Sequence, residues 1–405
     1  MAKKLKRDLT VEEQLARGPV DMPFLILVVL LTGIGVVMVF SASYATAFYD
    51  SYTAQNDPAY YFIRQLIFSG IGLAGMWLAS KVNYQQWRWG SVFVLGLAIL
   101  LLVLVLVPGV HTVRSDNVRR WIRSIGPIPA FQPSEVAKLG VILYFSARLS
   151  KRNQEKPHRL SPRSLWSGPV AWLDKIGFLE LIPYVAILGV IVLLMMREPH
   201  MSGTLLILAG AAAVLFAAGI HLGWFAAGGA VLGVLVVAMM SGYQSTRILV
   251  WQDPWSYPRD GGYQIIQSLY AIGSGGLTGL GLGKSRQKFL YLPEPENDFI
   301  FAIVCEELGL VGACVVLALF ALLIIRGYWI AIHARDRFGA LVVVGITTLL
   351  AVQVFLNISV VTNLLPTTGI SLPFFSYGGT ALCIQLAEMG IVLAVSRQIP
   401  AAKQG

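Results

Sequence analysis

The chain has 405 residues, of which 56% are hydrophobic and only 13% are charged, and its mean hydropathy is +0.69. These values exclude soluble globular domains and charged disordered chains, so we expect an integral membrane protein. In so apolar a chain, the formal net charge of +10 does not predict a nucleic-acid partner. The three cysteines lie in apolar stretches without metal-ligand spacing, which predicts buried thiols rather than disulfides or a zinc site.

Apolar stretches long enough to cross a bilayer as helices recur along the whole chain. The alternating pattern of barrel strands is absent, so the predicted fold class is all-α, a polytopic membrane protein with about ten transmembrane helices. The predicted spans lie near residues 22–43, 62–80, 89–108, 134–150, 180–196, 203–220, 223–241, 299–326, 338–362 and 377–396.

The positions of Lys and Arg predict the orientation, because cytoplasmic segments retain basic residues. These residues gather at the termini and in residues 81–88, 148–175 and 326–337, and an even number of spans puts both termini on that cytoplasmic side. We therefore expect a cytoplasmic tail (1–21), one ten-span membrane domain (22–397) with a cytoplasmic loop (151–179) and two outer loops (108–133 and 242–297), and a second cytoplasmic tail (398–405).

Both outer loops carry basic residues, against the rule that favours cations inside. The first places Arg119 and Arg120 beside Trp121. Arginine forks match phosphate oxygens, so a lipid-linked pyrophosphate is the simplest ligand. The alternatives are arginines that extend to lipid headgroups and a tryptophan that lies at the membrane interface.

The second outer loop contains a run of glycines between Ile272 and Lys284, which permits sharp turns and the close approach of a ligand. No strand or correctly spaced Gly-Lys-Ser accompanies the run, so it does not predict a nucleotide-binding loop. Asp298 ends the loop where the eighth span begins, and its carboxylate is either a general base or a helix N-cap. Glu306 and Glu307 lie deeper in that span and are expected to be structural, with a buried partner.

Several motifs, taken together, resemble the SEDS family of bacterial cell-wall polymerases, which comprises FtsW, RodA and SpoVE. They recur in order through the ten predicted spans, and residues 285–294 and 385–390 look more like FtsW and SpoVE than RodA. The motifs are Arg119–Trp121, Phe131–Glu135 with Lys138, Gln267–Leu277, Gln287–Glu294, Asp298–Phe301, Glu306–Gly309 and Pro366–Gly379.

The resemblance implies a peptidoglycan glycosyltransferase that polymerises lipid II into β-1,4 glycan strands on the outer face of the cytoplasmic membrane, with undecaprenyl diphosphate as the leaving group. Asp298 falls on the family's catalytic aspartate. The other residues expected to bind the pyrophosphate and sugars are Arg119, Arg120, Trp121, Lys138, Gln264, Ser274, Lys288, Glu294 and Ser376. A divalent cation, Mg²⁺ or Mn²⁺, is an optional cofactor to which the sequence assigns no ligand.

The implied partners are lipid II, a cognate class B penicillin-binding protein, other membrane proteins of the divisome and membrane lipid, and the implied location is the division septum. A RodA-like role in elongation, a SpoVE-like role in sporulation, a lipid II flippase and a non-catalytic scaffold remain as alternatives. The flippase would use polar residues of the last spans, namely Gln353, Asn357, Gln385 and Glu388.

Three departures from the family pattern affect the predicted site. Glu296 stands where many relatives have a histidine, and as a like charge it would raise the pKa of Asp298. Asn117 replaces a glycine before the paired arginines. Residues 198–200 read Glu-Pro-His, where many relatives read Gln-Pro-Asp.

Overall fold

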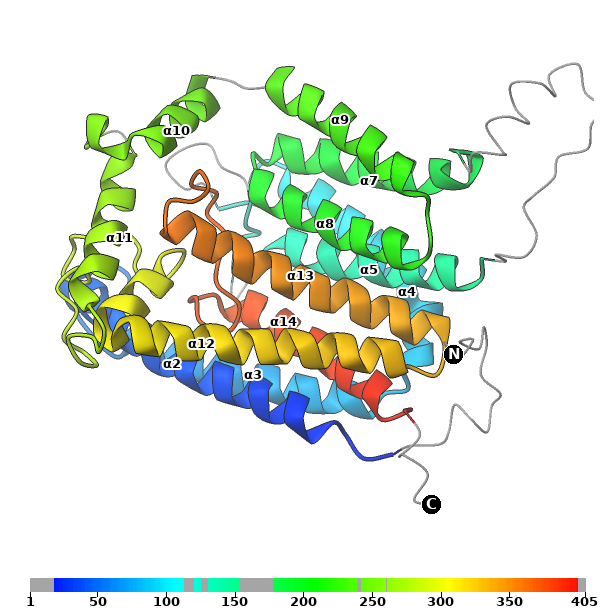
Figure 1. Cartoon of the computed structure of the whole chain (residues 1–405), viewed down its shortest axis with the longest axis horizontal. Coiled ribbons are helices and arrows are strands. Elements are labelled where there is room, and N and C mark those ends of the chain that lie inside the picture. The colour runs from blue at the N-terminus through cyan, green and yellow to red at the C-terminus, as the bar shows by residue number, and fades with distance from the viewer. Residues whose placement is uncertain are drawn as a thin grey trace, which may run out of the picture.

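The computed structural model describes residues 18–112, 120–124, 130–152, 178–238, 242–259 and 261–399. Helices lie side by side in a bundle (Figure 1). Within these residues the only β-pairing consists of two isolated bridges, His111 with Ile122 and Ile122 with Phe131. The all-α fold class is confirmed.

Each predicted span coincides with a helix, and seven of these helices are long and apolar enough to cross a membrane. The remaining ones are shorter or carry more charge. The ten helices are α2 (Met22–Tyr49), α3 (Tyr60–Lys81), α4 (Tyr84–Val105), α5 (Pro133–Ser150), α7 (Phe178–Arg197), α8 (Met201–Ala217), α9 (Leu222–Ala238), α12 (Ile300–His333), α13 (Arg337–Val361) and α14 (Gly379–Ser396).

The two ends of the bundle differ in content. One end, on the left of Figure 1, holds α11 (Gly262–Gly275) and the loop that leads into α12; we call it the loop end. The first and last described residues meet at the opposite end, the tail end, where the Gly18 amide donates to the Arg397 carbonyl at 2.8 Å. Arg326 and Asp21 form an ion pair of 2.6 Å there. The two ends of the described part of the chain therefore lie at one end of the bundle.

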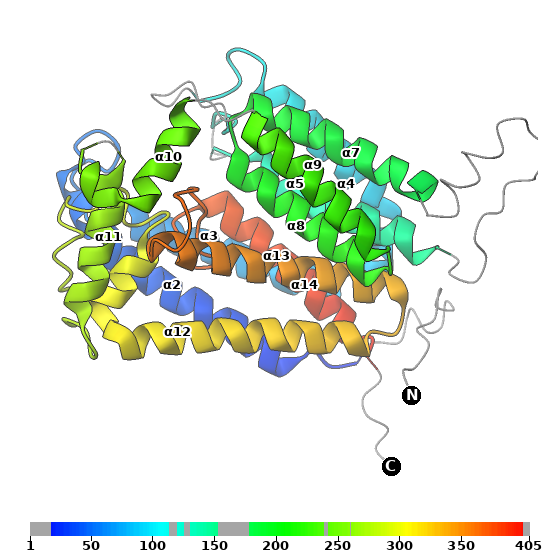
Figure 2. The same cartoon turned by 45° about the horizontal axis from the view of Figure 1, so that its top comes forward.

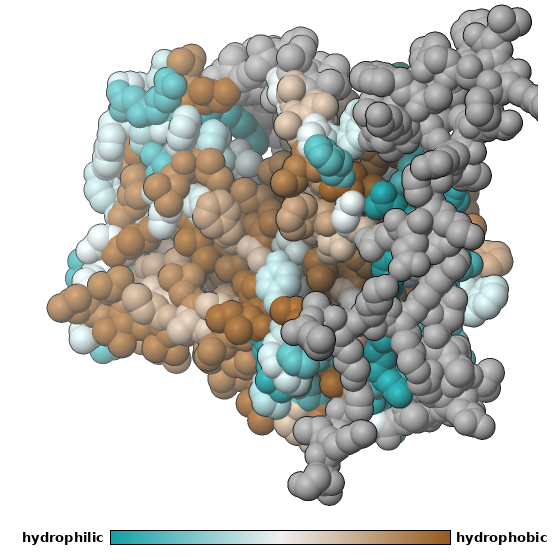
Figure 3. Space-filling model, turned by 45° about the vertical axis from the view of Figure 1, so that its right-hand side comes forward, coloured by the Kyte–Doolittle hydropathy of each residue, from teal (hydrophilic) through white to brown (hydrophobic). Residues whose placement is uncertain are grey.

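The face shown in Figure 3 has a large apolar surface on the described helices, as expected of a chain that spans a bilayer. The helices α13 and α14 are the most buried spans, with 72% and 61% of their most apolar residues inside the protein. They run through the middle of the bundle in both ribbon views (Figures 1 and 2). The connection between α13 and α14, residues 362–378, therefore reaches the loop end from the centre of the molecule.

The segment predicted as one long outer loop, 242–297, is partly helical, which corrects the expectation. It contains α10 (Gly242–Gln252), a short 3₁₀ helix (Pro254–Ser256) and α11. Helix α11 is amphipathic, and it buries Ile265, Ile266 and Ala271 against the bundle. That spacing of apolar residues is typical of a helix lying on a surface.

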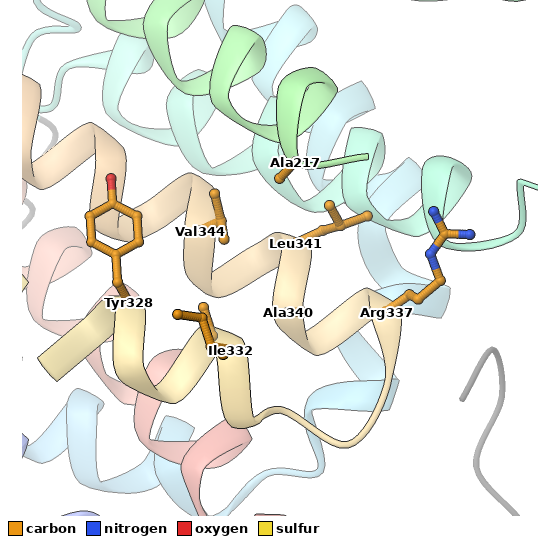
Figure 4. Close-up of a pocket in the computed structure, with 8 residues that line it drawn as sticks. Ala217, Tyr328, Ile332, Arg337, Ala340, Leu341 and Val344 are labelled. Atoms are coloured by element: carbon orange, nitrogen blue, oxygen red, sulfur yellow. The ribbon is translucent and has the colours of Figure 1, made fainter. Parts of the chain in front are cut away.

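We assign no functional site to the three cysteines or to a pocket at the tail end. All three cysteines are unpaired, and Cys314 is exposed rather than buried as expected, since it lies on an outward face of α12. A pocket of about 160 Å³ lies between α8, α12 and α13, lined by residues that include Tyr328 and Arg337 (Figure 4). Arg337 is the first residue of α13, so the pocket lies at the tail end, away from the glycine-rich loop.

Candidate functional site

Asp298 lies at the loop end, two residues before α12 begins, and is partly exposed. The N-cap position of α12 is occupied by Phe299, and no side-chain capping hydrogen bond is made there. Asp298 therefore lies one residue before the N-cap position of α12. Its side chain is partly exposed at the loop end.

The main chain around Asp298 is held by the α13–α14 connection. The Asn357 side-chain amide, on α13, donates to the Asp298 carbonyl at 2.8 Å and to the Ile370 carbonyl at 2.7 Å. Ser376 donates through its hydroxyl to the Asn297 carbonyl at 2.7 Å and accepts from the Leu372 amide at 2.7 Å. Ser376 was expected to bind substrate, but its hydroxyl is buried and positions the main chain beside Asp298.

Gly369 makes room for the Asp298 carboxylate. A Cβ atom on Gly369 would lie 3.2 Å from Asp298 Oδ2, and the φ angle of Gly369 is +68°, which disfavours other residues. The aspartate side chain therefore faces the main chain of the 362–378 connection at close range.

Lys288 does not have the role that the sequence suggests. It is only 2% exposed, and its ammonium lies 3.0 Å from Glu307 Oε1. The same ammonium donates to the Ser41 hydroxyl at 3.1 Å and to the Gly283 carbonyl at 2.7 Å. These three partners account for all three ammonium hydrogens, so the Lys288 ammonium is turned into the protein.

Glu306 is buried and is the centre of a second set of bonds. Its carboxylate accepts from the main-chain amides of Arg286 at 3.0 Å and Gln287 at 3.4 Å, and from the hydroxyl of Ser285. Ser274, predicted to bind substrate, donates to the same carboxylate at 3.4 Å. Ser274 is exposed and touches the edge of this set of bonds, whereas Glu306 and Glu307 are buried with partners, which confirms their structural interpretation.

Gln264 and Glu294 lie on the exposed side of the loop end. Gln264 donates to the Pro293 carbonyl at 3.2 Å, and Glu294 accepts from the side-chain amide of Asn297 at 3.3 Å. Glu294 is four residues from Asp298 in sequence, and Gln264 reaches the same loop through Pro293.

Glu296 is turned into the protein. It is 4% exposed, its carboxylate accepts from the Thr46 hydroxyl of α2 at 3.4 Å, and its carbonyl accepts from the Tyr377 amide at 2.8 Å. Burial raises the pKa of the neighbouring Tyr377 phenol, which keeps that group protonated at neutral pH. Glu296 therefore joins α2 to the start of α14.

Arg120 and Trp121 belong to a different part of the loop end. Arg120 donates to the Pro199 carbonyl in the turn between α7 and α8, and the Trp121 carbonyl accepts from the Thr112 amide at 3.0 Å. Arg119 and Asn117 lie outside the described residues. Lys138 is 4% exposed and pairs with Glu135 at 2.8 Å within α5, so its ammonium faces the protein interior instead of a substrate.

The α7–α8 turn contains two buried titratable groups. Glu198 has no exposed surface and neither of its carboxylate oxygens has a hydrogen-bond partner. Burial raises the pKa of Glu198 to about 8, although the Arg120 charge acts in the opposite direction. Burial lowers the pKa of His200 to about 3, and the charges of Arg120 and Lys138 act in the same direction. Both groups are therefore neutral near pH 7.

Three polar residues proposed for a flippase path are used internally. Gln353 donates to the Ser371 carbonyl at 3.1 Å, Asn357 makes the two bonds given above, and Gln385 accepts from the Phe374 amide at 3.1 Å. All three fasten the 362–378 connection to α13 and α14. This arrangement favours a site at the surface.

Exposed cations that the sequence did not single out as ligands flank the buried Lys288. Lys284 and Arg286 are both exposed, on the same loop. Arg247 of α10 donates to the Thr367 carbonyl at 2.9 Å and so lies against the connection that contains Gly369. The sequence cannot distinguish these exposed cations from the buried Lys288, because only the fold shows which basic residue has a buried acidic partner.

The described residues do not form a metal centre, since among them no group of three His, Cys, Asp or Glu side chains can hold an ion.

Comparison with known proteins agrees with this architecture. The family model described as "Cell cycle protein", for FtsW, RodA and SpoVE, matches residues 22–400. The chain is 41% identical to stage V sporulation protein E of Bacillus subtilis (strain 168) over 379 residues, which cover 93% of this chain and 97% of the relative. It is 39% identical to a probable peptidoglycan glycosyltransferase FtsW of Geobacter sp. (strain M18) over 388 residues, covering 94% and 98%.

Among solved structures, a chain of a peptidoglycan synthase complex that coordinates polymerization and crosslinking aligns with a TM-score of 0.70 and 28% identity. The alignment covers 94% of this chain and 98% of that one. The match spans nearly the whole of both proteins, in sequence and in fold. The chain therefore belongs to the SEDS family of FtsW, RodA and SpoVE.

Proposed function

We propose that this protein is a peptidoglycan glycosyltransferase that polymerises lipid II into β-1,4 glycan strands on the outer face of the cytoplasmic membrane. The observation that carries the proposal is the position of Asp298. Its partly exposed carboxylate stands at the loop end, and its main chain is held by Asn357. The relatives named as peptidoglycan glycosyltransferases support the same reaction.

In the proposed reaction, Asp298 accepts the proton of the sugar 4-hydroxyl while that oxygen attacks the anomeric carbon of the growing strand. The bond from that carbon to the diphosphate oxygen breaks, and undecaprenyl diphosphate leaves with the electron pair. A single displacement inverts an α-linked diphosphate to a β-linkage. Three cations of the loop end, the partly exposed Arg120 and the exposed Lys284 and Arg286, would stabilise the leaving charge.

A divalent cation that arrives with the diphosphate remains part of the proposal, because Mg²⁺ is often held by one or two carboxylates and substrate phosphates. Activity after EDTA treatment, with and without added Mg²⁺ or Mn²⁺, tests this requirement.

The proposed partner is a class B penicillin-binding protein, since one structural neighbour belongs to a complex that coordinates polymerization and crosslinking. The proposed setting is the division septum, together with other divisome proteins, and both termini are placed in the cytoplasm. To distinguish the septal role from the RodA-like and SpoVE-like roles, the gene is expressed in strains that lack FtsW, RodA or SpoVE. The strain whose growth or sporulation is restored identifies the role.

The test is incubation of the purified protein with lipid II, with and without the cognate transpeptidase, followed by separation of glycan products. We expect ladders of long strands, and none with Asp298→Asn. Transfer of labelled lipid II across liposomes without ladders would instead identify a flippase. Recruitment of the transpeptidase without either activity would identify a scaffold.

A further inference from the structure

Helix α12 is broken at Gly309, whose φ and ψ angles are +68° and −169°. The break separates a short segment, residues 300–308, from the long remainder of the helix. The glycine-rich loop crosses α12 at this point, because a Cβ atom on Gly309 would lie 2.3 Å from the Gly279 amide nitrogen. The sequence suggested that this glycine-rich loop lets a ligand come close. In the structure, the loop packs closely against α12 instead.

The loop replaces the hydrogen bonds that the break removes. On one side, the amides of Leu280 and Gly281 donate to the carbonyls of Glu306 and Glu307, both at 3.0 Å. On the other side, the amides of Leu310 and Val311 donate to the carbonyls of Gly276 and Leu277 at 2.9 and 3.1 Å. The loop is thus hydrogen-bonded to α12 on both sides of the break.

Glu306 and Glu307 place two carboxylates where the loop is hydrogen-bonded to the short segment, so this contact needs compensating positive charge. Both lie at the C-terminal end of the short segment, where the helix dipole disfavours anions. Glu307 is compensated by Lys288 at 3.0 Å and by the Ser41 hydroxyl at 2.7 Å, and all three side chains are buried. Removing Lys288 alone would leave a buried carboxylate without its cation, which is strongly unfavourable.

We propose that the buried Lys288–Glu307 ion pair is a clamp that positions Asp298. The clamp fixes one end of the short segment, and Asp298 lies just beyond its other end. A helical segment of nine residues is a rigid rod of roughly 13 Å, so a shift at Glu307 is transmitted to Asp298. Lys288 and Glu307 are positioning residues, which act on the reaction only through the aspartate.

This inference rests on the proposed function of Asp298, and the test uses Lys288→Met, Glu307→Gln and the double variant of the full-length protein. The matched control is Arg286→Ala, which removes an exposed cation two residues from Lys288. The measurements are kcat and KM for lipid II, together with hydrogen exchange at the amides of Leu280 and Gly281.

We expect Lys288→Met to lower kcat by about 10- to 100-fold and to leave KM within about two-fold, because misplacement of a catalytic group by about 1 Å has that effect. The double variant should be several-fold more active than Lys288→Met, since it also removes the unpaired charge. Arg286→Ala should lower kcat/KM, because a cation near the leaving group is lost, but should leave exchange at Leu280 and Gly281 unchanged.

A rise in KM for Lys288→Met at unchanged kcat, with no effect of Glu307→Gln, would return Lys288 to direct binding of the diphosphate and overturn the clamp. Additive losses in the double variant would also overturn it.

The exchange measurement does not depend on activity. Lys288→Met should speed exchange at Leu280 and Gly281 about ten-fold or more, even if the wild-type protein makes no glycan. Failure of the wild type to polymerise lipid II would reject the proposed function alone, whereas unchanged exchange in Lys288→Met would reject the clamp alone. A variant that does not fold is recognised because all amides of α12 and α13 lose their protection from hydrogen exchange. In that case the double variant, which has no unpaired charge, tests the clamp in place of Lys288→Met.

Discussion

The side-chain amide of Asn357 donates to the main-chain carbonyl of Asp298 at 2.8 Å, and its second hydrogen goes to the carbonyl of Ile370 at 2.7 Å. One buried amide thereby joins α13, the start of α12 and the α13–α14 connection. Asn357 is 1% exposed, so water does not reach the site to replace these bonds.

Asn357→Leu removes both donors and leaves two carbonyls unpaired, each at a cost on the order of 1–3 kcal/mol. We expect turnover to fall by roughly 10- to 100-fold, because Asp298 loses its support. The matched control is Gln353→Leu on the same helix, which frees the Ser371 carbonyl but not Asp298. Equal losses of turnover in both variants would contradict the assigned role of Asn357.

Asp298→Asn keeps the shape of the side chain but cannot accept a proton. We expect turnover to fall by roughly 10²- to 10⁴-fold, with little change in lipid II binding or in stability. Single-turnover rates and equilibrium binding of lipid II separate the two effects. Glu294→Gln, a nearby exposed carboxylate, is the control and should retain most activity; full synthesis by Asp298→Asn would move the base to another residue.

Gly369→Ala would place a methyl group 3.2 Å from Asp298 Oδ2 at a positive φ angle. We expect a loss of both stability and turnover, since the carboxylate must move. Gly109→Ala is matched in backbone strain, with a φ of +90°, but its Cβ meets no atom within 4 Å. The thermal midpoints should fall in both variants, and glycan synthesis should fall mainly in Gly369→Ala.

Arg120→Ala should weaken the use of lipid II without unfolding the protein. Loss of one charged hydrogen bond to a phosphate costs on the order of 1.5–3 kcal/mol, seen as a lower kcat/KM. Arg120→Lys should rescue this only partly, because the fork of donors is lost. Unchanged steady-state kinetics in Arg120→Ala would favour the headgroup-binding alternative.

The α7–α8 turn should make stability depend on pH. Glu198 holds its proton up to about pH 8 in the folded protein, well above its ordinary value of 4.5, so stability falls as pH rises between these values. His200 has the opposite effect: its pKa is lowered from 6.5 to about 3, so stability falls as pH drops through that range. Above about pH 6.5 only the Glu198 effect remains.

Glu198→Gln should therefore remove the fall in stability between pH 6.5 and 8. Thermal unfolding in detergent at these two pH values measures it, and His200→Gln is the control that should leave this part of the profile unchanged. The same drop in the wild type and in Glu198→Gln would show that Glu198 is not the group that titrates.

Hydropathy predicted the spans because each must bury its backbone hydrogen bonds in a single apolar helix. The same signal could not show that α12 is broken, since the break depends on contacts between Gly309 and a loop 30 residues earlier. Helix α11 was predictable in principle from the spacing of Ile265, Ile266 and Ala271. It was missed because its flanking glycines favoured an irregular loop.

For the site, the position of Asp298 followed from motif resemblance, and the structural interpretation of Glu306 and Glu307 followed from the cost of a charge in the bilayer. The role of Lys288 could not be predicted, because a basic residue in an outer loop has the same sequence signal whether it faces a phosphate or a buried carboxylate. The internal hydrogen bonds of Ser376 could not be predicted for the same reason, since a hydroxyl serves equally well inside a protein.

The break at Gly309 also bears on how the chain enters the membrane. Residues 310–333 alone form a helix of roughly 36 Å, which exceeds a hydrocarbon thickness of about 30 Å. The short segment with the two glutamates is thus not needed to complete the crossing. Insertion into the bilayer and assembly of the loop end can therefore occur as separate events. A variant that disrupts the loop end can still be inserted into the membrane.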